Sequence, residues 1–101
     1  MFSERGTGMQ EREYILRAEI VTANQKEIEE FLISSVGVNG ILRTDRGFIV
    51  RTTMKGKSAK ELNRALLSGM RRVDRRVTLH SEWTCCEVTE RFFGYKEQTV
   101  L

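Results

Sequence analysis

The chain has 101 residues, of which 17 are lysine or arginine and 14 are aspartate or glutamate, and its formal net charge is +3 at neutral pH. This length suits one domain with a single modest core. No apolar run is long enough to cross a bilayer, and the first residues lack the apolar stretch of a secretory signal. Cys85 and Cys86 are the only cysteines and are adjacent, which argues against a disulfide framework. We therefore expect a cytoplasmic protein that does not bind membranes.

Charge is distributed unevenly along the chain. Residues 41–76 hold 11 basic side chains against 3 acidic ones, whereas residues 1–40 hold 4 against 7 and residues 77–101 hold 2 against 4. The middle of the chain is therefore basic between two acidic segments, and it is the part expected to attract an anionic partner.

The first elements follow from local patterns. Residues 1–12 are polar and aperiodic, and we expect them to form a flexible arm. Polarity alternates over residues 14–21, which predicts a first strand with one drier face. Asn24 precedes Glu27 by three residues, the spacing of a capping box, and this predicts a first helix that ends near Gly37.

A β-hairpin and a second helix are predicted next. Residues 40–44 indicate a second strand, and the connection Asp45-Arg46-Gly47 predicts a hairpin whose glycine takes a left-handed conformation. Residues 48–54 are rich in β-branched and aromatic side chains, as expected of a third strand. Ser58 precedes Glu61 by three residues and forms a second capping box, which opens the helix.

The second helix is amphipathic, with a basic side toward water. Its apolar stripe recurs at three- and four-residue steps and consists of Leu62, Ala65, Leu66, Gly69, Met70 and Val73. Leu67 falls on the basic side instead. The basic residues that could contact a nucleic-acid backbone without reading bases are Lys57, Lys60, Arg64, Arg71, Arg72, Arg75 and Arg76. Alternatively, Glu27 and Glu30 of a neighbouring first helix pair with Arg64 and Arg71 across a solvated seam.

The complete order of elements predicts the fold class. Residues 77–84 alternate as a fourth strand, and residues 88–95 indicate a fifth strand that folds back as a hairpin. The order βαββαβ most economically gives an antiparallel sheet with both helices on one face. We therefore predict one ferredoxin-like α+β domain over residues 13–101, with an extra C-terminal strand.

The predicted sheet can be divided into two faces. The face toward the helices needs apolar residues, and we assign to it Leu16, Ala18, Ile20, Leu42, Phe48, Val50, Thr52, Val77 and Leu79. The face toward water then carries Arg17, Glu19, Arg43, Ile49, Arg51, Thr53, Thr78, His80 and Glu82. This second face is charged, as expected of a sheet open to solvent.

The segment Arg46-Gly47-Phe48-Ile49-Val50 resembles the start of the third-strand motif of RNA recognition motif domains, whose element order is also similar. In that family the third and fifth motif positions carry aromatic rings that stack on bases. The fifth position here is Val50, and turning it outward would drive Arg51 into the core. Residues 14–17 also lack the partner motif of the first strand. We attribute the likeness to a shared fold and assign no RNA-contacting residue from it.

The C-terminal hairpin is rich in aromatic residues: Trp83, Phe92, Phe93 and Tyr95. The neighbours Phe92 and Phe93 must point to opposite sides of a strand, so one leaves the core unless a second layer or subunit covers it. Aromatic residues anchor interfaces, and an edge strand can pair with another chain. We interpret the protein as a non-enzymatic module that self-associates or binds a protein partner through these four residues. In the alternative, the tail wraps back and buries both phenylalanines.

Catalytic and metal-binding patterns are poorly developed. His80, Cys85 and Cys86 are close in sequence, but no third residue is positioned to orient a cysteine–histidine pair. Zinc ligands in a pair are usually separated by two or more residues, and these cysteines are adjacent. We therefore expect no catalytic residue, no metal and no cofactor.

Overall fold

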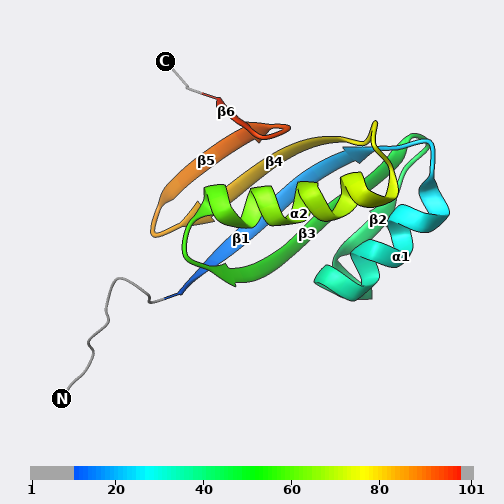
Figure 1. Ribbon diagram of the computed structural model, residues 1–101. Helices are drawn as coiled ribbons and strands as arrows, with labels where there is room; N and C mark the ends of the chain where they lie inside the picture. The colour runs from blue at the N-terminus through cyan, green and yellow to red at the C-terminus, as the bar shows by residue number, and fades with distance from the viewer. Residues whose placement is uncertain (1–10, 99–101) are drawn as a thin grey trace.

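The computed structural model describes residues 11–98 (Figure 1). In order, its elements are β1 (Arg12–Val21), α1 (Gln25–Val36), the short 3-10 helix η2 (Val38–Gly40), β2 (Ile41–Arg43), β3 (Gly47–Gly56), α2 (Ala59–Val73), β4 (Thr78–Cys85), β5 (Val88–Phe93) and β6 (Lys96–Gln98). Most of the predicted arm, residues 1–12, lies outside the described residues, and β1 already begins at Arg12.

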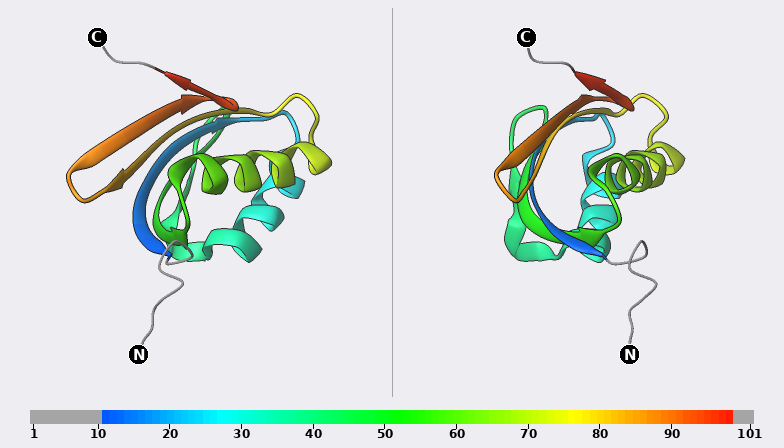
Figure 2. Two further views of the ribbon diagram at one scale, coloured as in Figure 1. Left: turned by 60° about the vertical axis from the view of Figure 1, so that its left-hand side comes forward. Right: turned by 90° about the vertical axis from the view of Figure 1, so that its left-hand side faces the viewer.

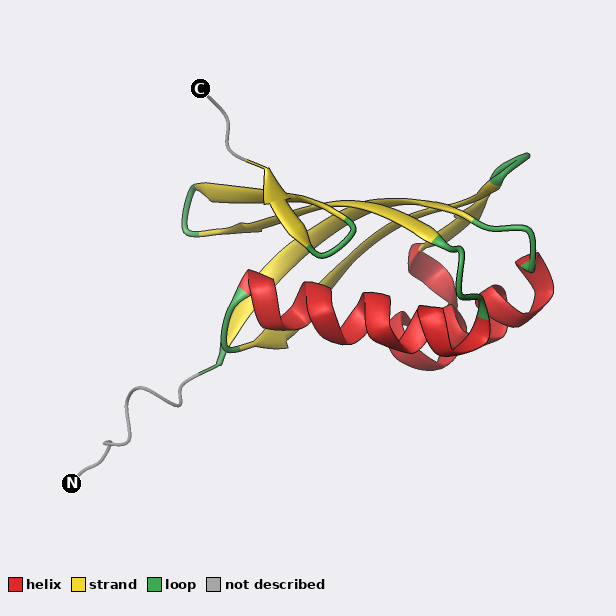
Figure 3. Cartoon of the chain, turned by 45° about the horizontal axis from the view of Figure 1, so that its top comes forward, coloured by secondary structure: helices red, strands yellow, loops and turns green. Residues whose placement is uncertain are grey.

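The described strands form one sheet in the order β2-β3-β1-β4-β5-β6, and every neighbouring pair is antiparallel. Both helices lie on the same side of this sheet (Figure 3). Two further views show the sheet bending around the helices (Figure 2). The fold is therefore α+β. The sequence predicted one extra C-terminal strand, and the structure has two, because the chain turns at Gly94 and returns as β6.

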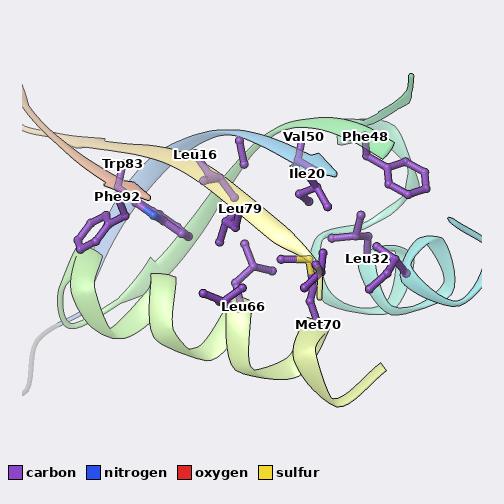
Figure 4. Close-up of a cluster of buried hydrophobic side chains, with 14 of the residues drawn as sticks. Leu16, Ile20, Leu32, Phe48, Val50, Leu66, Met70, Leu79, Trp83 and Phe92 are labelled. Carbon is purple, nitrogen blue, oxygen red and sulfur yellow. The ribbon is translucent and has the colours of Figure 1, made fainter. Parts of the chain in front are cut away.

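The core lies between the sheet and the two helices. Alternate residues of β1 are buried, as the alternation of polarity predicts: Tyr14, Leu16, Ala18 and Ile20. Trp83 and Phe92 pack together at one end of the core, and Leu32 packs near Phe48 at the other (Figure 4). Complete burial of one such side chain stabilises the folded state by about 1.5–3 kcal/mol.

The buried side of α2 differs from the predicted stripe. Its buried residues are Ala59, Asn63, Leu66, Leu67 and Met70. Leu67, predicted on the basic side, is fully buried, whereas Ala65 and Val73 are exposed. The buried positions follow steps of three and four residues through Asn63, and the polarity of this residue concealed the stripe in the sequence.

The two predicted helix caps have different outcomes. The backbone N–H of Glu61 donates to the Ser58 hydroxyl at 3.1 Å, so the predicted cap of α2 is confirmed. Asn24 is the N-cap residue of α1, as predicted, and its carbonyl oxygen accepts from the backbone N–H of Ile28 at 3.0 Å. Its side chain makes no capping bond, so the predicted capping box was wrong. The backbone N–H of Asn24 donates to the Thr22 hydroxyl at 3.0 Å, so a side chain from the preceding turn bonds to this end of the helix instead. Gly37, with φ of 87°, ends α1 as expected.

The short strand β2 reverses part of the predicted assignment of faces. Arg43 lies opposite the buried Phe48 and forms an ion pair with Glu29 of α1, so it points toward the helices. Leu42 lies opposite Ile49 on the other face and is 63% exposed. Both assignments were wrong, because Ile41 and Leu42 are apolar neighbours and a three-residue strand does not show which of them is buried.

Gly47 does not take the predicted left-handed conformation. It begins β3, opposite Val21, and a Cβ atom at this position would lie 1.9 Å from the carbonyl oxygen of Ile20. The hairpin therefore requires glycine for close approach of two backbones rather than for a positive φ.

Candidate interaction surface

The face of the sheet that points away from the helices, called the open face below, is organised by strand register into two transverse rows. The Glu19 row crosses all six strands and contains Leu42, Ile49, Glu19, His80, Phe93 and Lys96. The Arg17 row is its neighbour and contains Arg51, Arg17, Glu82, Arg91 and Gln98. On each strand that carries both rows, the two row residues are two positions apart in the chain, which is the spacing of side chains on one face.

The Arg17 row places like charges next to each other. Arg17 lies directly opposite Arg51 on one side and Glu82 on the other. Arg91 donates to Glu82 with an Nε to Oε2 distance of 3.0 Å, so this carboxylate already has a cationic partner. Within residues 11–98 neither Arg17 nor Arg51 forms an ion pair. Directly opposed like charges destabilise a strand pair, and an anionic group from outside would relieve this repulsion.

An open pocket of about 300 Å³ lies between these two rows. Charged and polar residues from four strands contribute to its lining: Arg17, Glu19, His80, Glu82, Arg91 and Gln98. Because cations and carboxylates alternate around it, the pocket suits a partner that also carries both signs of charge.

Apolar side chains are also exposed on the open face. Phe93 is 46% exposed, and its ring packs against the imidazole of His80 with a centroid distance of 4.3 Å in an edge-on arrangement. Ile15 on β1 is 59% exposed. Together with Leu42 these residues add apolar area to a surface of mixed charge, a composition typical of protein interfaces.

The four aromatic residues expected to bind a partner occupy three different environments. Trp83 and Phe92 are buried in the core of their own chain (Figure 4). We correct the expectation that they contact a partner, because their side chains face the helices. Phe92 and Phe93 do point to opposite sides of β5, and Phe93 reaches the open face. The fourth residue, Tyr95, lies elsewhere.

Tyr95 packs against α2 rather than on the open face. Its hydroxyl lies 3.0 Å from the Ser68 hydroxyl, and the Arg71 guanidinium lies 5.3 Å from the centre of its ring. The turn that carries Tyr95 is tied to α2 a second time, because the Asn63 amide donates to the carbonyl oxygen of Gly94 at 2.8 Å. The aromatic hairpin therefore does not form one continuous surface.

Most of the basic side of α2 faces solvent. Lys60, Arg64 and Arg72 on α2 are exposed, as are Lys57, Arg75 and Arg76 just outside the helix. Arg71 is half-buried, with its guanidinium over the ring of Tyr95. Among residues 11–98, none of these seven side chains forms an ion pair. The alternative interpretation, in which Arg64 and Arg71 form ion pairs with Glu27 and Glu30 of α1, is therefore not observed. The helices instead approach at Gly69, where a Cβ atom would meet the Phe31 ring at 2.3 Å, and Arg71 points away from that contact.

A buried polar network in the core could not be found from the sequence. The Ser81 hydroxyl and the Trp83 indole N–H both donate to the side-chain oxygen of Asn63, at 2.5 and 3.2 Å. Buried polar atoms are costly unless they are hydrogen-bonded, and Asn63 satisfies both strand residues. Its partners are 18 and 20 residues away in the chain, so no local pattern connects them.

The cysteines and histidine do not meet. His80 lies on the open face, whereas Cys85 packs against the core on the opposite side of the sheet. The two sulfur atoms of Cys85 and Cys86 lie 3.2 Å apart in the turn between β4 and β5. The hydrogen bond between Cys85 and Cys86, together with partial burial of Cys85, raises the pKa of the Cys85 thiol. A raised thiol pKa disfavours the nucleophilic thiolate.

Comparisons with known proteins find no matching family model, no similar curated protein and no similar solved structure. Neither helix in the described part of the chain has the length and apolar character needed to cross a membrane. The function is therefore inferred from the residues of this chain alone.

Proposed function

We propose that this protein is a non-enzymatic interaction module that self-associates through the open face of its sheet, with Phe93 of the C-terminal hairpin as the central contact. The observation that carries the proposal is that a six-stranded sheet has both helices on one side, while Phe93, Ile15 and Leu42 are exposed on the other. Antiparallel sheets can leave one face in water, but that face is then normally polar. We also propose a cytoplasmic location, because the free cysteines Cys85 and Cys86 are compatible with a reducing compartment.

We also propose that β1 to β4 and the two helices form a ferredoxin-like unit. The order of elements, βαββαβ, and the strand order β2-β3-β1-β4 support this assignment. In this interpretation β5 and β6 extend the sheet beyond β4, and they bring Phe93 and Lys96 to the open face.

The proposed function is tested by two aromatic substitutions in the same hairpin. Phe93→Ser removes apolar area from the open face, whereas Tyr95→Ser removes an aromatic ring that packs on α2. We expect Phe93→Ser to weaken self-association at least about tenfold, because full burial of one phenylalanine is worth about 1.5–3 kcal/mol and each of the two copies buries the 46% of Phe93 that is still exposed. Tyr95→Ser should leave association unchanged. The measurement is light scattering coupled to size-exclusion chromatography across a concentration series, and a wild-type chain that stays monomeric throughout would refute the proposal.

A second candidate function is binding to the backbone of nucleic acids through α2. It is favoured by the absence of ion pairs for the seven basic residues within the described part of the chain. Lys60, Arg64 and Arg71 also share one stripe of the helix, because they are four and seven residues apart. Binding of mixed-sequence RNA or DNA should then weaken steeply with salt. A plot of the logarithm of the binding constant against the logarithm of the salt concentration should have a slope of about −0.7 to −0.9 per neutralised phosphate. Lys60→Glu with Arg64→Glu should abolish it, and no binding by the wild-type chain at low salt would exclude this function.

A further inference from the structure

We infer that the partner of the open face is a second copy of this chain, packed face to face across a two-fold axis that runs parallel to the Glu19 and Arg17 rows and passes between them. This inference rests on the proposed function and adds the orientation of the two copies. Homo-oligomers most often form closed two-fold pairs, in which the same patch must complement itself. The two rows satisfy this condition on β1, β4 and β5.

The strongest complementarity is on β1. A two-fold axis between the rows keeps each strand opposite the same strand of the second copy but reverses its direction. Each residue of one row therefore faces the residue of the other row that lies on the same strand of the second copy. Arg17 then faces Glu19 of the partner subunit, and Glu19 faces the partner's Arg17. Within residues 11–98 neither side chain forms an ion pair inside its own chain, so both remain free to form this pair.

The same operation matches the next two strands. On β4, His80 faces Glu82 of the partner subunit, and on β5, Phe93 faces the partner's Arg91. The first contact joins an imidazole to a carboxylate, and the second places a guanidinium over an aromatic ring. Because the axis generates each contact twice, three kinds of contact on three strands give six favourable contacts in one interface.

Other positions of an axis that runs parallel to the rows give unfavourable contacts. An axis through the Arg17 row would place Arg17 against its own copy and Glu82 against its own copy. An axis through the Glu19 row would place Glu19 against Glu19 of the partner subunit. Like charges in contact at an interface oppose binding. Among axes parallel to the rows, the charges therefore favour the position between the rows, which also brings the exposed Ile15 opposite Val21 of the partner subunit.

The decisive experiment reverses one charge at a time. Arg17→Glu places two carboxylates in contact twice per pair of copies, and Glu19→Arg places two guanidinium groups in contact. Each variant alone should associate about 10–100-fold more weakly than the wild-type chain. When the two variants are mixed, every such contact again joins opposite charges, so the mixture should form heterodimers with affinity close to wild type. Native mass spectrometry of the mixture measures them directly.

Glu30→Arg on the exposed side of α1 is the control, because it makes a similar change of charge away from the open face. Urea unfolding of each variant checks that the exposed substitutions leave the fold intact. The inference is overturned if both single variants associate as the wild type does, or if both dissociate and their mixture stays monomeric. In either case a loss of association by Phe93→Ser leaves the proposed function standing. A wild-type chain that is monomeric at every concentration would instead refute the proposed function itself.

Discussion

The side-chain amide of Asn63 donates a hydrogen bond to the carbonyl oxygen of Gly94 at 2.8 Å, and this bond joins the buried side of α2 to the turn between β5 and β6. The same side chain accepts hydrogen bonds from Ser81 and Trp83 of β4. One polar residue thus connects the helix layer to the part of the sheet that lies beyond β4. The position of Phe93, which precedes Gly94, depends on this connection.

Asn63→Ala should destabilise the folded state by about 3 kcal/mol. The substitution removes the acceptor of the buried Ser81 hydroxyl and the donor to the partly buried Gly94 carbonyl, whereas the Trp83 indole N–H keeps the Ser81 hydroxyl as an acceptor at 3.1 Å. Each unsatisfied group costs about 1–3 kcal/mol. Urea unfolding measures the change in the free energy of unfolding. Asn39→Ala, on the exposed η2 helix, is the control and should change it by less than about 0.5 kcal/mol. Equal effects of the two substitutions would contradict the role assigned to Asn63.

The carboxylate of Asp74 makes part of the stability dependent on pH. The Thr22 hydroxyl donates to Asp74, the backbone N–H of Arg76 also donates to it at 3.0 Å, and these bonds lower the pKa of the carboxyl group. A lowered pKa in the folded state means that the stabilisation is fully present above the ordinary aspartate pKa of about 4 and is lost as the pH falls below it.

Asp74→Asn should therefore lower the free energy of unfolding at neutral pH by about 1–2 kcal/mol. The difference from the wild type should shrink below about pH 4 as the wild-type carboxylate takes up a proton. Chemical unfolding at a series of pH values gives both quantities. Asp45→Asn in an exposed loop is the control and should follow the wild type at every pH. A difference for Asp74→Asn that is constant down to the lowest pH would show that the carboxylate charge is not the cause.

The turn between β4 and β5 contains two strained residues. Cys86 and Glu87 have φ values of 57° and 69°, and Cys85 pairs directly with Val88. A two-residue hairpin loop with positive φ at both positions is a type I′ turn, which favours Asn-Gly. Replacing Cys86 with Asn and Glu87 with Gly should raise the free energy of unfolding by about 1–2 kcal/mol. Cys86→Ser, which removes the thiol and keeps the strain, should change it by less than about 0.5 kcal/mol; an equal gain from both changes would rule out the turn as the cause.

Close backbone packing at Gly47 predicts a severe effect of a single methyl group. Gly47→Ala would force its Cβ atom against the Ile20 carbonyl oxygen, a backbone atom that cannot move without disturbing β1. We expect a loss of about 2–3 kcal/mol in the free energy of unfolding. Gly56→Ala is the matched comparison at the other end of β3, because its Cβ atom would meet only the Leu62 side chain, which can shift. A larger loss at Gly56 than at Gly47 would contradict this explanation.

Sequence patterns predicted the elements where local chemistry is strong and failed where tertiary contacts decide. Ser58 and Glu61 located the start of α2, and Gly37 located the end of α1, because capping depends on neighbours in the chain. The strand β6 was missed because Lys96–Gln98 contains no apolar residue.

The candidate site was predictable only in part. The outward direction of either Phe92 or Phe93 followed from strand periodicity, and Phe93 is the exposed one. The contact of Tyr95 with Ser68 could not be predicted, because it joins residues that are 27 positions apart. The Glu19 row and the Arg17 row likewise depend on the register of the strands, which is set jointly by the turns and the buried residues.

The two edge strands, β2 and β6, are each three residues long in the described part of the chain. Unpaired backbone groups along a sheet edge can recruit strands from other molecules, and short edges suppress this growth. Lys96 adds a charge to one of these edges, which further disfavours fibril formation. The protein can therefore keep a broad sheet surface accessible with little tendency to extend into amyloid-like ribbons.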